Sequence, residues 1–135
     1  MKVYLDTNVI VGAVATRGLC ADLLYVVLAD HDLVAGERLL AEVRRVLKTK
    51  LRLPAATISE VEAFLRRQGE LAAAAQVHNV KVRDPADARI LAEALGGGAA
   101  ILVTGDRDLL DVADRAPLRI VSPRGMWDLL RGGLE

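Results

Sequence analysis

Two aspartates follow apolar segments that have the composition of buried strands. Asp6 comes directly after Val3–Leu5, and Asp106 comes after Ile101–Val103 and a two-residue turn. In open α/β sheets, ligands bind at the carboxyl ends of the parallel strands. Carboxylates gathered at that edge can hold a hard divalent cation. Asp is also a good helix cap, so both roles stay open for each residue taken alone.

Asp87 interrupts the apolar face of a predicted helix. Ile90, Leu91 and Ala94 follow it at i+3, i+4 and i+7, so its carboxylate lies on the stripe that should face the core. Burying a lone charge is costly, and we therefore expect a cation, a metal ion or a capping interaction to compensate it. The alternative is a cap formed with Asp84, and that capping pattern explains Asp84 better than it explains Asp87.

Two further acidic residues have less distinctive positions. Glu42 falls at the edge of the apolar face of a predicted helix, where it can point into a cleft or into solvent. Asp108 follows Asp106 at the start of another helix, whose positive end favours anions. Asp108 is therefore either a second metal ligand or compensation for the helix dipole.

Several converging carboxylates repel one another unless a cation joins them. Mg²⁺ and Mn²⁺ take oxygen ligands, and a pair of such ions can activate water and stabilise a leaving oxygen in phosphodiester hydrolysis. His31 and His78 have no evident partner, and the sequence has neither a nucleophile elbow nor a Walker loop. The residues thus favour metal-assisted hydrolysis over histidine-driven chemistry.

Length and composition predict a single domain over residues 1–135. Aliphatic residues dominate the 53% hydrophobic fraction, and aromatic residues supply only 3%. Eighteen basic residues balance eighteen acidic ones, so any binding of a polyanion must be local. Cys20 is the only cysteine, which excludes an internal disulfide and a cysteine-cluster zinc site. We expect it to be a core thiol in a reducing compartment.

The N-terminal region has some features of a signal peptide. Lys2 precedes the apolar stretch Val9–Ala15, but Asp6 and Asn8 interrupt that pattern. No segment reaches the ~20 apolar residues that a membrane span needs. We therefore expect a soluble, cytoplasmic protein that does not interact with membranes.

Short apolar runs alternate with longer stretches of helical spacing. The predicted strands are Val3–Leu5, Leu33–Ala35, Ile101–Val103 and Leu118–Val121. The predicted helices are Cys20–Ala29, Glu37–Lys48, Ile58–Arg67, Ala86–Leu95, Leu109–Ala113 and Met126–Leu130. The alanine-rich segment Gly69–Val80 could finish a helix or form a short one. This order predicts an α/β fold, a three-layer α/β/α sandwich with a central, mostly parallel sheet of Rossmann-like type.

Three motifs in this order resemble the PIN-domain family, in particular its small prokaryotic, VapC-like members, the toxin components of toxin–antitoxin pairs. They are Val-Tyr-Leu-Asp-Thr-Asn-Val-Ile at Val3–Ile10, the segment Arg83–Asp87 leading into a helix, and Leu-Val-Thr-Gly-Asp-Arg-Asp-Leu-Leu at Leu102–Leu110. Each motif is short, but the three together, with the intervening elements, are fairly specific. The likeness spans nearly the whole chain.

The resemblance implies a Mg²⁺- or Mn²⁺-dependent endoribonuclease with one or two bound ions. The implied acidic site consists of Asp6, Glu42, Asp87 and Asp106. The implied metal ligands are Asp6, Asp87, Asp106 and Asp108. The residues implied to orient those carboxylates are Thr7, Asn8, Asp84 and Thr104. For this last group, ordinary turn and capping chemistry is the alternative.

The resemblance also implies partners. Such proteins form homodimers or higher homo-oligomers, and a small antitoxin protein silences those that are toxins. The basic group Arg44, Arg45, Lys48, Lys50 and Arg52 lies just beyond Glu42 and could hold RNA phosphates beside the metal ions. A solvated helix face is the alternative interpretation.

Three other function classes compete with this interpretation. A phosphatase of the haloacid-dehalogenase type has an Asp after its first strand, but it needs a second Asp two positions later, where this chain has Asn8. A receiver-like signalling domain needs a lysine near its site, and no lysine follows Lys81. A non-catalytic PIN-like binding or regulatory module would keep the fold, and metal binding with activity separates it from a nuclease.

Overall fold

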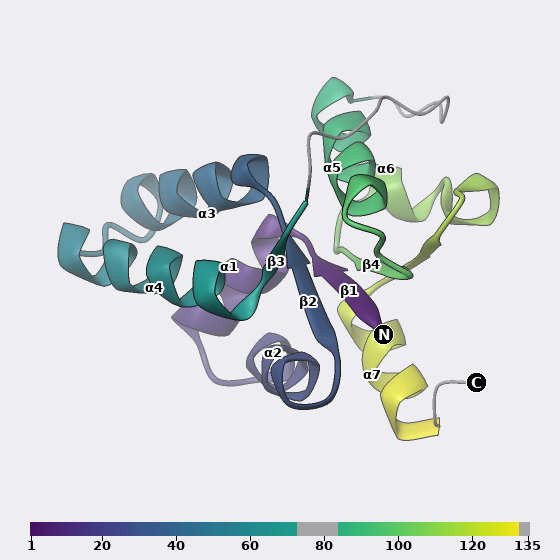
Figure 1. The fold of residues 1–135 in the computed structure, drawn as a ribbon, viewed down its shortest axis with the longest axis horizontal. Helices are drawn as coiled ribbons and strands as arrows, with labels where there is room; N and C mark the ends of the chain where they lie inside the picture. The colour runs from purple at the N-terminus through teal and green to yellow at the C-terminus, as the bar shows by residue number, and fades with distance from the viewer. Residues whose placement is uncertain (73–83, 133–135) are drawn as a thin grey trace.

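The computed structural model describes residues 1–72 and 84–132 and shows five strands in one sheet within those ranges. The strands are β1 (Lys2–Leu5), β2 (Asp32–Ala35), β3 (Glu70–Leu71), β4 (Ile101–Val103) and β5 (Arg119–Val121). The helices in the same ranges are α1 (Thr7–Ala15), α2 (Leu19–Asp30), α3 (Glu37–Thr49), α4 (Ala55–Gln68), α5 (Pro85–Gly96), α6 (Arg107–Leu110) and α7 (Pro123–Gly132). A short 3-10 helix covers Ala113–Arg115. Helices α5 and α6 lie on one side of the sheet, and α1 to α4 with α7 lie on the other (Figure 1).

All the strand pairs of this sheet are parallel, and their order is β3-β2-β1-β4-β5. The central strand β1 pairs with β2 on one side, where Val3 faces Leu33, and with β4 on the other, where Leu5 faces Val103. The chain moves from β1 toward β3 and then returns to the opposite side of β1. The β1/β4 boundary is therefore the point where strand order reverses, the usual ligand-binding position in such sheets.

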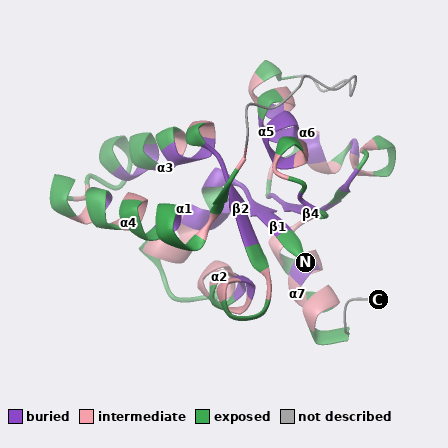
Figure 2. Cartoon of the chain, in the orientation of Figure 1, coloured by how far each residue is buried: buried purple, intermediate pink, exposed green. Residues whose placement is uncertain are grey.

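The central strands are buried because helices cover both faces of the sheet. Tyr4, Leu5, Val34, Leu102 and Val103 have no exposed surface. Figure 2 shows the same burial along β1, β2 and β4 and on the inward sides of the helices. Continuous apolar strands of this kind belong to parallel sheets enclosed by helices. The predicted α/β sandwich is confirmed, and the described sheet is parallel throughout.

Helix α1 and strand β3 were not among the predicted elements. The apolar stretch that forms α1 lacks a polar face, so its spacing does not distinguish a helix from other buried structure. Strand β3 is an exposed, two-residue edge strand without an apolar run. The predicted helix Leu109–Ala113 is wrong in extent, because α6 starts and ends earlier and a separate 3-10 helix follows. The start of Gly69–Val80 forms β3 rather than a helix. The rest of that segment, with His78, falls in the interval 73–83, which lies outside the described residues.

Two further expectations concern Cys20 and membranes. Cys20 is half-buried and packs at the edge of the core, close to Gly12 of α1, so it is less buried than predicted. Within the described ranges, no single helix has the length and apolarity to cross a membrane. The pair α1 and α2 passes that test only when taken together, and the two helices are bent by 105°.

Candidate metal centre

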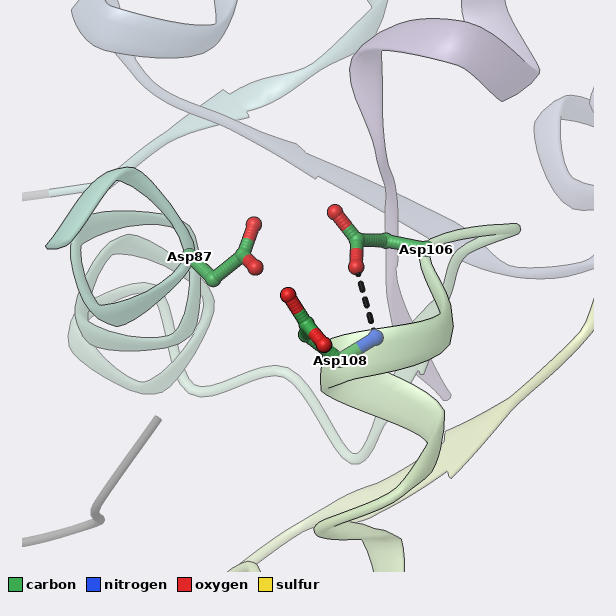
Figure 3. A group of neighbouring side chains, drawn as sticks. All are labelled: Asp87, Asp106 and Asp108. Atoms are coloured by element: carbon green, nitrogen blue, oxygen red, sulfur yellow. Dashed lines mark hydrogen bonds between the residues drawn. The ribbon is translucent and has the colours of Figure 1, made fainter. Parts of the chain in front are cut away.

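Three aspartates meet above the carboxyl end of β4. Asp87 comes from the first turn of α5, whereas Asp106 and Asp108 come from the start of α6. Each of the three offers a carboxylate oxygen, and these oxygens all lie within 4.8 Å of one another. Figure 3 shows the side chains pointing toward one another from the two helices. We call Asp87, Asp106 and Asp108 the aspartate triad.

Local backbone geometry holds Asp106 in place. It is the N-cap of α6, and its Oδ1 accepts a 2.8 Å hydrogen bond from the Asp108 amide, drawn in Figure 3. Its own amide donates a 3.0 Å bond to the Thr104 hydroxyl. Asp106 is thus a helix cap, as the alternative interpretation expected. One capping hydrogen bond still leaves lone pairs on its carboxylate that can bind a cation.

Asp6 lies beside the triad and is tied to it through Thr104. Asp6 Oδ1 accepts from the Thr7 amide at 2.7 Å, and Asp6 Oδ2 accepts from the Thr104 hydroxyl at 2.7 Å. The same Thr104 hydroxyl accepts from the Asp106 amide. A single threonine therefore connects the carboxylate of Asp6, after β1, to the backbone of Asp106, after β4.

Asp6, Asp87 and Asp106, but not Asp108, line one pocket of about 230 Å³. Asp6, Asn8, Asp87 and Asp106 face this pocket together with Arg38 and Glu42 of α3. We call it the acidic pocket. Helices α3 and α5 supply residues on two of its sides, and the ends of β1 and β4 lead into it. The structure thus brings residues from distant parts of the sequence to one place.

Burial shapes the electrostatics of this pocket. Asp87 is only 3% exposed, and burial together with the charge of Asp106 raises the pKa of Asp87 to about 7. Burial also raises the pKa of Asp6, while the hydrogen bonds from Thr104 and Thr7 oppose that rise. Asp87 Oδ2 is buried and has no hydrogen-bond partner within residues 1–72 and 84–132. An uncompensated, buried carboxylate oxygen among other carboxylates fits a divalent cation that prefers oxygen ligands.

Glu42 reaches the edge of the acidic pocket but is held by an ion pair. Its two carboxylate oxygens accept from Arg45, at 2.6 Å and 3.2 Å, and this interaction lowers the pKa of Glu42. Glu42 therefore lies at the pocket without belonging to the aspartate triad.

The predicted basic group does not enter the acidic pocket. Arg44 forms an ion pair with Glu62 of α4, and Arg45 is held by Glu42. Arg44 and Lys48 line a separate, largely apolar pocket of about 310 Å³ between α3 and α4. Lys50 and Arg52 are exposed beyond the end of α3.

The residues predicted to orient the carboxylates are placed differently from one another. Thr104 bonds Asp6 directly. Thr7 donates its amide to Asp6, but its own hydroxyl is buried and has no partner in the described residues. Asn8 is exposed and lines the acidic pocket. Asp84 is the exposed N-cap of α5, where it accepts from the Ala86 amide at 2.8 Å.

Sequence reasoning missed Arg38 and Glu93. Arg38 faces the acidic pocket, and its spacing from Glu42, one turn along the same helix, is the signal that could have indicated it. Glu93 is a buried glutamate of α5 that accepts hydrogen bonds from Tyr4 and from the start of α3. Its signal was a carboxylate among the apolar positions of that helix.

Comparisons with known proteins give a consistent picture of the fold. The family described as PIN domain matches residues 2–108. Among curated proteins, none matches the chain. The structure of VapBC-1 from nontypeable Haemophilus influenzae is similar, with a TM-score of 0.64 and 16% identity over 92% of this chain and 99% of that one.

Two further solved structures resemble the fold to a comparable degree. VapBC2 from Rickettsia felis, bound to a DNA fragment from its promoter, has a TM-score of 0.62 and 17% identity, covering 90% of this chain and 98% of that one. FitAcB from Neisseria gonorrhoeae has a TM-score of 0.56 and 18% identity, covering 90% of this chain and 98% of that one.

Proposed function

The chain belongs to the PIN domain family, as the motif resemblance predicted, and from that premise we propose that it is a metal-dependent endoribonuclease of the toxin type. The observation that carries the proposal is the buried Asp87 oxygen, which lacks a partner in the described residues and lies within the aspartate triad. A site of this kind costs free energy unless a cation occupies it. The reaction is hydrolysis of an RNA phosphodiester bond.

Asp6, Asp87, Asp106 and Asp108 are the residues that would hold Mg²⁺ or Mn²⁺. A bound divalent ion supplies a water of lowered pKa as nucleophile and neutralises charge on the phosphate. Thr104 would hold the Asp6 carboxylate in place through a hydrogen bond, while its hydroxyl also accepts from the Asp106 amide. The burial of Asp6 and Asp87 strengthens their attraction for a cation by reducing competition from water.

Arg38 and Glu42 would act from the wall that α3 forms. Arg38 is a basic residue in the lining of a pocket that is otherwise rich in carboxylates. Such a group can bind phosphate oxygens with two parallel hydrogen bonds and so draw an RNA backbone toward the metal ligands. Glu42 would complete the acidic site after it leaves Arg45, because its present bonds occupy both carboxylate oxygens.

The partners follow from the same premise. The solved VapBC and FitAcB structures resemble this fold, and we propose that a small antitoxin protein binds this chain as well. We propose a homodimer or higher homo-oligomer and a cytoplasmic location, where RNA is available and the free thiol of Cys20 stays reduced. The basic residues Arg44 and Lys48 are proposed to contact RNA outside the acidic pocket.

Cleavage of a labelled single-stranded RNA tests the proposal. Wild type is compared with Asp6→Asn and Asp87→Asn in Mg²⁺ or Mn²⁺, with each variant checked for folding by circular dichroism. Asp128→Asn is the matched control, because this substitution removes the same charge at an exposed position of α7, away from the site. We expect cutting in wild type and the control, and loss of cutting in both site variants and in chelator. Inert wild type across several RNAs and both ions, or equal cutting by the site variants, contradicts the nuclease and favours a binding module.

A further inference from the structure

Glu93 is a buried carboxylate that makes contacts across the molecule. Its Oε1 accepts from the Tyr4 hydroxyl at 2.6 Å and from the Leu39 amide at 3.1 Å. Its Oε2 accepts from the Arg38 amide at 3.1 Å. Glu93 itself is only 9% exposed, so these bonds form largely away from water. One side chain of α5 thereby joins the central strand β1 to the start of α3.

The two amide bonds make Glu93 a helix cap supplied from another helix. The first amides of a helix have no partner within it and are usually capped by a Ser, Thr, Asp or Asn at the N-cap. In α3 the N-cap is Gly36, which has no side chain to offer. A Cβ at Gly36 would lie 2.0 Å from the carboxyl carbon of Glu93. The missing side chain at position 36 is therefore what makes room for the carboxylate from α5.

This cap joins two helices that line the acidic pocket. The capped helix, α3, carries Arg38 and Glu42 to the pocket. The helix that provides the capping side chain, α5, carries Asp87. Tyr4 stands in β1 just before Asp6. Glu93 thus belongs to α5 and contacts β1 and α3, and each of these three elements carries or leads into a residue of the pocket.

We propose that Glu93 is a positioning residue that fixes α3 against α5, so that Arg38 and Glu42 face Asp87 across the acidic pocket. This inference rests on the proposed nuclease function for its kinetic consequence, although the geometry it describes does not depend on RNA. A bare capping role would only stabilise α3. A positioning role also sets the separation between the two walls of the pocket, and small errors in such separations are costly to catalysis.

A set of variants separates the two roles. Tyr4→Phe is the reference, because it avoids leaving a buried hydroxyl without an acceptor once Glu93 is changed. Adding Glu93→Ala removes both the cap and the connection between helices. Adding Gly36→Ser as well restores a local cap, since Gly36 has the extended backbone of an N-cap and the space left by the carboxylate accepts the new side chain. The triple variant therefore has a capped α3 that is no longer attached to α5.

The separation of the helices is measured by pulsed electron paramagnetic resonance. Nitroxide labels are placed at the exposed positions Thr49→Cys on α3 and Arg89→Cys on α5, in a Cys20→Ser background. Thr49 lies at the far end of α3 from the cap, where a change in helix orientation produces the largest displacement. We expect a narrow distance distribution in the reference and a broadened or shifted one in the triple variant.

Stability and activity complete the test. The triple variant should recover most of the melting temperature that the double variant Tyr4→Phe/Glu93→Ala loses. Its kcat should nevertheless stay roughly 10–100-fold below that of the Tyr4→Phe reference, and it should bind Mn²⁺ about 10-fold more weakly than the reference does. Recovery of kcat together with the melting temperature overturns the proposal, and so does an unchanged distance distribution. If the wild type cuts no RNA, the nuclease function fails, and the distance distribution with the Mn²⁺ affinity still decides the role of Glu93.

Discussion

The Thr104 hydroxyl donates a 2.7 Å hydrogen bond to Asp6 Oδ2, and both residues are buried. This bond spans the ends of the adjacent parallel strands β1 and β4. The same hydroxyl accepts a hydrogen bond from the Asp106 amide, so two hydrogen bonds, one donated and one accepted, fix the position of the Thr104 hydroxyl. The orientation of the Asp6 carboxylate therefore depends on a residue that carries no charge.

Replacing Thr104 by Val keeps the shape of the side chain and removes this hydrogen bond. We expect Thr104→Val to destabilise the protein by about 1–3 kcal/mol, since buried polar atoms lose a partner. We expect cleavage and Mn²⁺ affinity to fall roughly 10–100-fold. Thr104→Ser retains the hydroxyl and is the matched control in denaturant unfolding, kinetics and Mn²⁺ titration. Equal losses in both variants would show that packing of the methyl group, rather than the hydrogen bond, is responsible.

Replacing Asp87 by Asn should stabilise the metal-free protein while removing its response to metal. An ionised Asp87 carboxylate at alkaline pH raises the free energy of the folded state, which is what the raised pKa of Asp87 means. We therefore expect a higher melting temperature for Asp87→Asn than for wild type at pH 8 in chelator. Wild type, but not the variant, should gain about 2.7 kcal/mol at a Mn²⁺ concentration 100 times its Kd. Asp128→Asn, which leaves the triad intact, should behave as wild type, and a strong Mn²⁺ response in Asp87→Asn would contradict the assignment.

The pH dependence of stability follows from the same residue. The pKa of Asp87 is raised from its ordinary value of 3.8 to about 7, so the folded state binds a proton that the unfolded state releases between these values. The stabilisation is fully present below pH 3.8 and is lost as pH rises through about 7. Its full size is roughly 4 kcal/mol at most. Chemical denaturation in chelator over a pH series that starts near the lower pKa of 3.8 and ends above the upper pKa of about 7 measures it, and Asp87→Asn should flatten that part of the profile. A wild-type profile that is equally flat would exclude a raised pKa.

Arg38 should matter more to RNA than its neighbours on α3. It faces the acidic pocket, whereas Arg44 lies in the separate pocket against α4. We expect Arg38→Ala to lower kcat/KM at least about tenfold, as expected for loss of a charge-assisted phosphate contact. Arg44→Ala is the matched control and should have a smaller effect. The comparison is made with single-stranded RNA at low and at physiological salt, and a larger loss in Arg44→Ala would move RNA binding to the α3/α4 pocket.

The sequence was sufficient for the central sheet because β1, β2 and β4 each contain a continuous apolar run, which a polar residue ends in β1 and β4 and a glycine ends in β2. Asp87 could be singled out because a carboxylate on an apolar helix face needs compensation. Strand β3 could not be recognised, because its pairing with β2 is a tertiary contact that leaves no pattern in two exposed residues.

The residues of α3 and α5 show the limit of such reasoning. Glu93 resembles an ordinary helical glutamate until α3 is packed against α5, since its amide donors lie far away in the sequence. The same holds for Thr104, whose partner Asp6 belongs to the first strand. Helical spacing predicted the face of Glu42 but could not show that Arg45 holds its carboxylate.

The position of β1 between β2 and β4 has a consequence for protein synthesis. Strand β1 can pair with β2 as soon as residue 35 has left the ribosome, but the acidic pocket also needs β4 and the start of α6, which extend from residue 101 to residue 110. Pairing between segments so far apart in sequence is slow and comes late. A nascent chain therefore carries Asp6 without the rest of the acidic pocket until β4 and the start of α6 have been synthesised and have joined the sheet.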